Sequence, residues 1–266
     1  MTTRPLIGIL LDFEPSGTFS SRPHHALRTG YFEAVWRAGG LPLGLGYQEG
    51  SARAVLDSVR GLLIPGGTYP FPNHYYGAAG DGGGALHPRH KAELALVAEA
   101  LARDMPVLGI CAGMQVIAAQ AGLRLFKSLR DDVDCAVDHL DGKPAEETAH
   151  AISVAPDTKL RRILAAETLM VNSAHNEAPR QNLTGDAVRD AAAGAVAWPV
   201  NLVQSAAAPD GVIEGLERTD HPFCIGVQWH PEFFIDDPDD PNMRLFRAFV
   251  EAAGGYAGLD SAEHPA

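Results

Sequence analysis

Short apolar runs alternate with helical segments along the first half of the chain, and this alternation constrains the fold more than any other feature. The runs are apolar enough to be strands buried on both faces of a sheet. We therefore expect one doubly wound α/β domain, with a mainly parallel central sheet and helices on both faces. The expected strands are residues 5–11, 41–45, 61–64 and 105–110, and the expected helices are residues 25–38, 52–59 and 89–102.

The last third of the chain is richer in short strand candidates. A helix over residues 241–253 is expected to close the fold, and no repeat or interdomain linker is visible. We expect one domain over residues 1–253 and a loose C-terminal tail over residues 254–266. The later strand candidates are residues 150–154, 169–171, 193–196, 212–213 and 223–228.

The composition is acidic, with 21 Lys and Arg against 33 Asp and Glu and a net charge of −12. Such a surface repels phosphate backbones and anionic lipids, so nucleic acids and membranes are poor candidate partners. No apolar run approaches the roughly 20 residues that span a bilayer, and the N-terminus does not resemble a signal peptide. The three cysteines form no CxxC pair and no zinc-like spacing. A cytoplasmic protein is expected.

The segment around Cys111 carries the strongest chemical signal. An apolar strand runs into Cys111 and an Ala-rich helix follows it, with Gly109 and Gly113 on either side. This Gly-x-Cys-x-Gly pattern is the thiol counterpart of the nucleophile elbow of serine hydrolases. Free N–H groups at the helix start favour a thiolate. An arbitrary cysteine is more often structural, and that interpretation is kept for Cys135 and Cys224.

A thiolate nucleophile needs a base and a group that orients it, and His230-Pro231-Glu232 offers both. His230 stands at the end of an expected strand, where sheet edges present functional groups. Glu232 is two residues further on and can hold the imidazole ring. A lone histidine at a strand end is more often a surface residue, but together with the cysteine elbow the motif predicts a catalytic triad.

Acyl transfer also needs N–H donors for an oxyanion. The N–H of Ala112, directly after the nucleophile, is one candidate. The Gly66-Gly67 turn after the third strand is another, since glycine lets the backbone approach a substrate closely. The alternative is a plain turn that ends the strand.

Residues 68–88 form a long irregular segment with four aromatic residues and a glycine run at 80–84. It predicts a lid or pocket wall, although a surface loop remains the alternative. His74, His87 or Arg89 could meet a carboxylate at the far end of a substrate. The acidic residues 236–241 read as a solvated loop, so no metal site and no cofactor are expected.

Three segments in this order resemble the class I glutamine amidotransferase superfamily: Leu-Ile-Pro-Gly-Gly at 63–67, Gly-Ile-Cys-Ala-Gly-Met-Gln at 109–115 and Gly-Val-Gln-Trp-His-Pro-Glu at 226–232. Residues 171–175 and 210–214 resemble the γ-glutamyl-γ-aminobutyrate hydrolase, or peptidase C26, branch. The resemblance implies the flavodoxin-like fold of that superfamily. Its implied site residues are Cys111 as nucleophile, His230 as base, Glu232 as orienting group, Gly67 and Ala112 as oxyanion hole, and Gly66, Gln115 and His175 as substrate contacts.

The chain departs from the branch at two places near the pocket. Ala112 stands where an arginine is common, and Asn176-Glu177 where His-Gln is common. These departures concern the substrate more than the chemistry. The expected function is hydrolysis of a small γ-glutamyl amine through a cysteinyl thioester. The alternatives are a glutaminase subunit that supplies a separate synthetase with ammonia, or a non-catalytic binding protein on the same scaffold. A homo-oligomer is left open.

Overall fold

A computed structural model describes residues 3–76, 85–133, 135–180 and 198–258. A nine-stranded sheet runs through this described part of the chain, in the order β4-β1-β5-β6-β13-β12-β11-β8-β9. The expected strand at 193–196 and the glycine run at 80–84 lie outside the described residues. The strands are β4 (Leu41–Leu45), β1 (Leu6–Leu10), β5 (Gly61–Ile64), β6 (Val107–Ile110), β13 (Cys224–Val227), β12 (Ile213–Arg218), β11 (Leu202–Ala207), β8 (His150–Val154) and β9 (Thr168–Val171).

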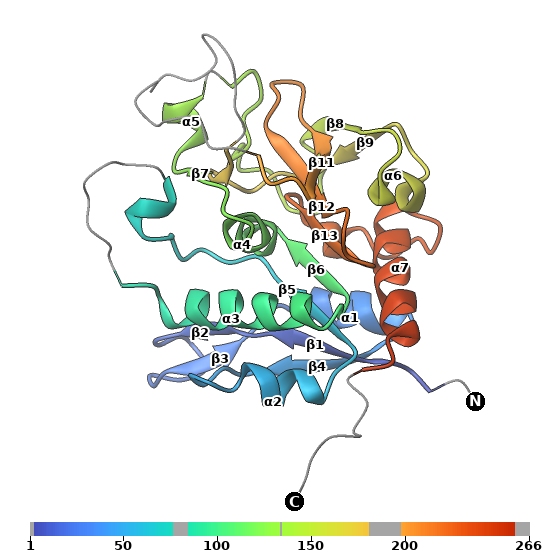
Figure 1. Cartoon of the computed structure of the whole chain (residues 1–266). Helices are drawn as coiled ribbons and strands as arrows, with labels where there is room; N and C mark the ends of the chain where they lie inside the picture. The colour runs from blue at the N-terminus through green and yellow to red at the C-terminus, as the bar shows by residue number, and fades with distance from the viewer. Residues whose placement is uncertain (1–2, 77–84, 134, 181–197, 259–266) are drawn as a thin grey trace, which may run out of the picture.

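The sheet has a parallel part and an antiparallel part. Strands β4, β1, β5, β6 and β13 pair in parallel. Strands β12, β11, β8 and β9 extend the sheet beyond β13 with antiparallel pairing. In Figure 1 the parallel strands occupy the lower half of the molecule and the antiparallel ones the upper half. The large sheet predicted from the sequence is confirmed, and the antiparallel part is an addition that the strand candidates alone did not specify.

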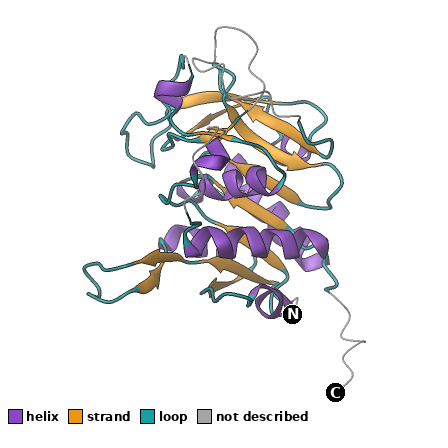
Figure 2. Ribbon diagram, turned by 60° about the vertical axis from the view of Figure 1, so that its left-hand side comes forward, coloured by secondary structure: helices purple, strands orange, loops and turns teal. Residues whose placement is uncertain are grey.

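Helices cover both faces of the sheet, as predicted, with strands in the middle layer (Figure 2). One apolar cluster joins the sheet to α1 (Thr29–Arg37), α6 (Lys159–Leu164) and α7 (Pro241–Gly255). A second cluster joins the other face to α2 (Ala52–Asp57), α3 (Pro88–Ala102) and α4 (Ala112–Gln120). No helix within the described ranges is long and apolar enough to cross a membrane.

Small elements surround the carboxyl ends of the parallel strands. The hairpin β2 (Asp12–Glu14) and β3 (His24–Ala26) lies at the left of Figure 1. It replaces the start of the helix expected at 25–38, which begins only at Thr29 because residues 24–26 pair with β2. The remaining elements are η1 (Asn73–Tyr76), β7 (Leu125–Phe126), α5 (Leu129–Asp132), β10 (Ala178–Pro179) and η2 (Pro231–Phe233).

Two helix ends bear on the predictions. Gly39 ends α1 with φ of +98°, a left-handed conformation that glycine adopts without strain, and this confirms the predicted stop. Helix α7 continues to Gly255, so the first residues of the expected tail are helical. The boundary between domain and tail stays a prediction.

Candidate active site

Cys111 occupies a tight turn between β6 and α4. Its φ is +52° and its ψ is −108°, a conformation rarely adopted by residues other than glycine. The flanking glycines make the turn sterically possible. A Cβ on Gly109 would lie 2.6 Å from the carbonyl group of Gly113, and a Cβ on Gly113 would collide with the carbonyl oxygen of Ile64. The structure therefore has the strand–turn–helix arrangement that the sequence predicts, with the thiol at the carboxyl edge of the sheet.

His230 reaches Cys111 because their strands are neighbours. Strands β6 and β13 pair in parallel, and the N–H of Cys111 donates to the carbonyl oxygen of Val227 at 2.8 Å. Nδ1 of His230 lies 2.8 Å from Oε1 of Glu232. Burial lowers the pKa of His230, but Cys111 and Glu232 beside the ring outweigh burial and raise that pKa to about 10. The three expected triad residues thus lie together, and their arrangement favours an imidazolium next to the sulfur.

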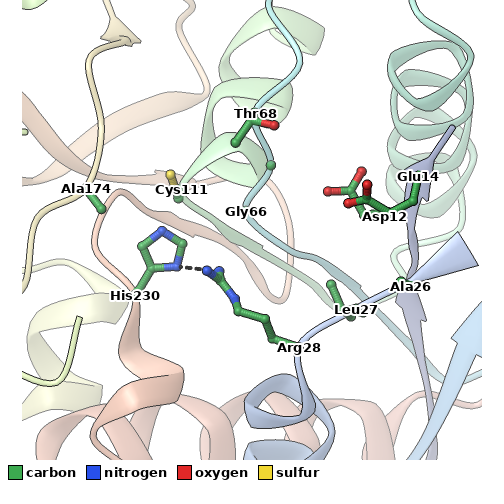
Figure 3. Close-up of a pocket in the computed structure, with 11 residues that line it drawn as sticks. Asp12, Glu14, Ala26, Leu27, Arg28, Gly66, Thr68, Cys111, Ala174 and His230 are labelled. Carbon is green, nitrogen blue, oxygen red and sulfur yellow. Dashed lines mark hydrogen bonds between the residues drawn. The ribbon is translucent and has the colours of Figure 1, made fainter. Parts of the chain in front are cut away.

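Two residues that sequence reasoning missed complete the surroundings of the imidazole. Nη2 of Arg28 lies 3.3 Å from Oε1 of Glu232 and donates to the hydroxyl of Tyr31 at 2.9 Å. The hydroxyl of Tyr31 accepts from the N–H of Gly66 at 3.1 Å and lies 3.4 Å from Nδ1 of His230. Figure 3 shows the guanidinium of Arg28 directed at the ring. No local motif marks either residue, so the sequence alone could not single them out.

The buried side chain of Arg89 supports the Gly66-Gly67 turn. It is 1% exposed, and Nη2 donates to the carbonyl oxygens of Pro65 and Gly66 at 2.9 and 3.0 Å. A Cβ on Gly67 would collide with this guanidinium. Arg89 is also paired with Glu93 and Asp12, at 2.7 and 2.8 Å. The suggestion that Arg89 meets a substrate carboxylate is therefore wrong, because its charge is already neutralised inside the protein.

The two proposed oxyanion donors lie beside the thiol. Gly67 lines the same pockets as Cys111, and Ala112 is the first residue of α4. Gly66, by contrast, has its N–H engaged by Tyr31. This arrangement leaves the amides of Gly67 and Ala112 as the pair suited to a developing oxyanion.

Cys111 lines both a smaller pocket of about 210 Å³ and a larger pocket of about 550 Å³, and the two pockets share Gly67, Thr68 and Ala174. Figure 3 shows the larger pocket, with Cys111 and His230 on one side and Asp12 and Glu14 on the opposite side. The smaller pocket is lined by Gly67, Thr68, Tyr69, Cys111, Gln115, Ala174, His175, Asn176 and Glu177.

Two of the expected substrate contacts line the smaller pocket, but both are held by other protein groups. Nε2 of Gln115 donates to the carbonyl oxygen of Glu177 at 3.0 Å. Nδ1 of His175 lies 3.0 Å from the same oxygen, and its Nε2 is turned toward Glu214 at 3.4 Å. The carboxylate of Glu177 accepts from Tyr76 at 3.0 Å, and burial raises the pKa of Glu177. The departure at Glu177 therefore places a carboxyl group in the wall of this pocket.

The aromatic segment after Gly67 only partly forms a pocket wall. Tyr69 lines the smaller pocket and stacks on His87 with ring centroids 3.7 Å apart. Phe71 and Tyr76 are core residues instead, and Phe71 stacks on His90 at 4.1 Å. Phe71 and Tyr76 therefore do not belong to the expected aromatic lid, because their side chains are buried in the core below η1.

Comparisons with known proteins show the family of this chain. The family model described as Peptidase C26 matches residues 5–232. The chain is 35% identical to a glutamine amidotransferase of Mycobacterium tuberculosis, over 99% of this chain and 79% of the relative. It is 30% identical to a glutamine amidotransferase-like protein of Rickettsia prowazekii, over 95% of this chain and 99% of the relative. It is 27% identical to the γ-glutamyl-γ-aminobutyrate hydrolase of Escherichia coli K12, over 93% of each chain.

Solved structures share the fold. The glutaminase domain of a Trypanosoma brucei CTPS, with bound acivicin, superposes with a TM-score of 0.62 at 15% identity and covers 96% of each chain. A protein of Thermoplasma acidophilum described as part of a GMP synthase superposes with a TM-score of 0.60 at 16% identity, again over 96% of each chain. At such identities the likeness concerns the fold alone.

Proposed function

The chain belongs to the peptidase C26 family, and from this premise we propose which bond it cleaves. The family, together with relatives named as hydrolases, supports a glutamine amidotransferase-like hydrolase. The proposed reaction is hydrolysis of the γ-glutamyl amide of a small aliphatic amine, such as γ-glutamyl-γ-aminobutyrate. Cys111, His230 and Glu232 are the proposed triad. The proposed products are glutamate and the free amine.

The proposed chemistry follows from the groups at the elbow. The Cys111 thiolate attacks the amide carbon, and the amides of Gly67 and Ala112 bind the oxyanion. The His230 imidazolium gives its proton to the departing amine, leaving a thioester on Cys111 and a neutral imidazole. That imidazole then takes a proton from water, which attacks the thioester and releases glutamate and the thiolate. Glu232 keeps the ring in the required orientation throughout.

The observation that carries the proposal is that Cys111 lines two pockets of different size. The smaller one, about 210 Å³ and walled by Gln115 and Glu177, suits a glutamyl group, whose ammonium the Glu177 carboxylate can bind. The larger one, about 550 Å³, offers room for a substituent on the amide nitrogen. A glutaminase that releases only ammonia needs no such second space.

Charges around the larger pocket bear on the amine. Asp12 is paired with Arg89, and Arg28 is paired with Glu232, at 2.8 and 3.3 Å. Glu14 is exposed at the pocket and has no ion-pair partner among the described residues. A carboxylate in this position favours an amine that carries a second, positively charged nitrogen. We therefore place γ-glutamyl amides of linear diamines beside γ-glutamyl-γ-aminobutyrate as candidate substrates.

The second candidate function is a glutaminase that serves a separate synthetase, and the glutamine amidotransferase name of the Mycobacterium tuberculosis relative motivates it. Purified protein should be assayed against glutamine, γ-glutamyl-γ-aminobutyrate and a mono-γ-glutamyl diamine. We expect kcat/KM for at least one substituted amide to exceed that for glutamine by about tenfold or more. Fast hydrolysis of glutamine with no turnover of either substituted amide would favour the glutaminase instead. No turnover of any of the three, with Cys111 intact, would favour the binding protein.

A further inference from the structure

A buried carboxylate outside the active site lacks a hydrogen-bond donor among the described residues. Glu214 lies on β12 and is 0% exposed, and neither of its carboxylate oxygens accepts a hydrogen bond from any residue that the structure describes. Three buried histidines surround Oε1 of Glu214. Nδ1 of His139 lies 3.4 Å away, Nε2 of His150 lies 3.5 Å away and Nε2 of His175 lies 3.4 Å away. These three ring nitrogens also lack hydrogen-bond partners in the described part of the chain.

The opposite ring nitrogens show how the histidines are protonated. Nε2 of His139 lies 3.0 Å from Oδ2 of Asp210. Nδ1 of His150 lies 3.2 Å from the carbonyl oxygen of Ala151, and Nδ1 of His175 lies 3.0 Å from that of Glu177. Carbonyl and ionised carboxylate oxygens only accept, so each of these nitrogens carries the hydrogen. In a neutral ring the nitrogen that faces Glu214 then presents a lone pair, whereas in an imidazolium it carries a second hydrogen.

Three neutral rings would direct their lone pairs at this carboxylate oxygen and repel it, and a cation between them would remove that repulsion. Leaving a buried carboxylate unpaired costs several kcal/mol. Such an arrangement, with each histidine held from behind by an oxygen acceptor, is the pattern by which proteins orient histidines toward a metal ion.

We propose that His139, His150, His175 and Glu214 form a buried Zn²⁺ site, with Asp210 as the hydrogen-bond partner of His139. Nitrogen and oxygen ligands at zinc bond lengths in a tetrahedron lie about 3.3–3.4 Å from one another. The separations of 3.4 to 3.5 Å between each ring nitrogen and Glu214 match this spacing. The ligand atoms of His139, His150 and Glu214 lie within 4.8 Å of one another, and His175 has to move inward to join them as the fourth ligand. Glu214 and Asp210 together balance the two charges of the ion.

A neighbouring group offers a poorer site. Cys135, His139 and Asp210 also bring potential ligand atoms together. There, however, Nε2 of His139 already bonds Asp210 at 3.0 Å, and the thiol of Cys135 donates to the carbonyl oxygen of Leu129 at 3.5 Å. The unpartnered atoms all face Glu214, which favours the three-histidine site.

The site would be structural. Four protein ligands close the coordination of zinc and leave no position for a substrate. The ligands come from the loop after α5, from β8, from the loop after β9 and from β12, all in the upper half of Figure 1. The loop after β9 also carries Ala174, Asn176 and Glu177, which line the smaller pocket beside Cys111. A metal ion would therefore tie this pocket wall to the antiparallel part of the sheet.

Metal content of the purified full-length chain tests the proposal independently of any enzymatic assay. After exposure to Zn²⁺ and dialysis, we expect about one Zn²⁺ per chain. X-ray absorption should show four nitrogen and oxygen neighbours with imidazole scattering. Replacement by Co²⁺ should give the intense visible absorption of a tetrahedral complex. A wild-type chain that holds less than about a tenth of an equivalent of zinc, or a six-coordinate Co²⁺ spectrum, would overturn the proposal.

Variants locate the ion. Glu214→Gln and His150→Gln should each lose most of the retained zinc. His221→Gln is the matched control, because His221 is also buried but accepts from the N–H of Phe223 at 3.2 Å, outside the cluster. Equal zinc in all three variants would contradict the assignment. If the cluster variants fail to fold, the wild-type stoichiometry and spectra still decide. Loss of zinc binding with γ-glutamyl hydrolysis intact, or the reverse, separates this proposal from the proposed function.

Discussion

Asn172 holds the main chain of His230 from both sides. The N–H of His230 donates to Oδ1 of Asn172 at 2.8 Å, and Nδ2 of Asn172 donates to the carbonyl oxygen of His230 at 3.1 Å. A carboxamide accepts through its oxygen and donates through its nitrogen, so the Asn172 side chain can do both at once. Asn172 therefore fixes the backbone from which the proposed base projects, and we assign it as a positioning residue.

Asn172→Asp should weaken this attachment while keeping the size of the side chain. The carboxylate cannot donate, so the carbonyl oxygen of His230 loses its partner at a cost of about 1–3 kcal/mol in unfolding free energy. We expect kcat to fall by roughly tenfold to a hundredfold with a smaller change in KM. Asn242→Asp is the matched control, because Asn242 is buried and its hydrogen bonds go to Trp229, at 2.8 Å, and to Asp240 rather than to a triad residue. Similar kcat losses in both variants, at equal folded fractions, would contradict a positioning role.

Cys111→Ala should abolish turnover and leave the fold intact. The substitution removes the proposed nucleophile, and alanine meets the same backbone strain at φ of +52° as cysteine does. Circular dichroism and thermal unfolding check the fold. A glutamine-like electrophile should label the wild-type chain on Cys111, which peptide mass mapping can locate. Labelling of Cys135 or Cys224 would refute the assignment of the nucleophile.

Gly66→Ala should displace the imidazole. A Cβ at this position would lie 2.6 Å from Cε1 of His230 and 3.2 Å from the hydroxyl of Tyr31. Because a shift of about 1 Å at a reacting group can cost about a hundredfold in rate, we expect a loss of that order in kcat. Gly46→Ala is the control, since its Cβ would meet His25 at an ordinary 3.6 Å. Unchanged kcat in Gly66→Ala would show that the ring is not held where the structure has it.

The alkaline limb of the pH–rate profile should lie well above the ordinary histidine range. The pKa of His230 is raised from 6.5 to about 10, because Cys111 and Glu232 outweigh the opposing effect of burial. The imidazolium that protonates the leaving amine should therefore persist until the pH approaches that value. Glu232→Gln removes one of these charges and should move the limb to lower pH. A limb near pH 6.5 in the wild-type profile would contradict the ion pair.

The same shift predicts how stability depends on pH. The folded-state pKa lies above the unfolded value of 6.5, so the stabilisation is fully present below pH 6.5 and is lost as the pH rises toward about 10. Unfolding free energies of wild type and Cys111→Ala should therefore converge over this window. If the unfolding free energies of the two proteins differed by the same amount at every pH, this stabilisation by His230 would be contradicted.

Glu14→Gln should change the preference among amines. Removing an exposed carboxylate at the larger pocket should lower kcat/KM for a γ-glutamyl diamine by roughly three- to tenfold and leave glutamine almost unaffected, as expected for a solvent-screened contact. Glu49→Gln alters an exposed carboxylate elsewhere and serves as the control. Equal losses for diamine and glutamine substrates would mean that Glu14 does not contact the amine.

Several features followed from the sequence because they are local. The buried strand, the two glycines around Cys111 and the Ala-rich helix lie within one short segment, so the elbow was readable from neighbouring residues. The same holds for His230 and Glu232, whose spacing of two residues already placed them together. Parallel pairing of β6 and β13, which the strand candidates did not specify, then brought the two motifs to one edge.

Only the tertiary structure decided which distant residues support these motifs. Tyr31 and Arg28 contact His230 and Glu232 across about two hundred residues of sequence, and Arg89 is buried beneath Gly67 instead of facing a substrate. The four proposed zinc ligands stand on separate segments, with no spacing that a sequence pattern could recognise. Strand order and antiparallel register set such contacts, and these depend on packing of the whole chain rather than on the periodicity of any one segment.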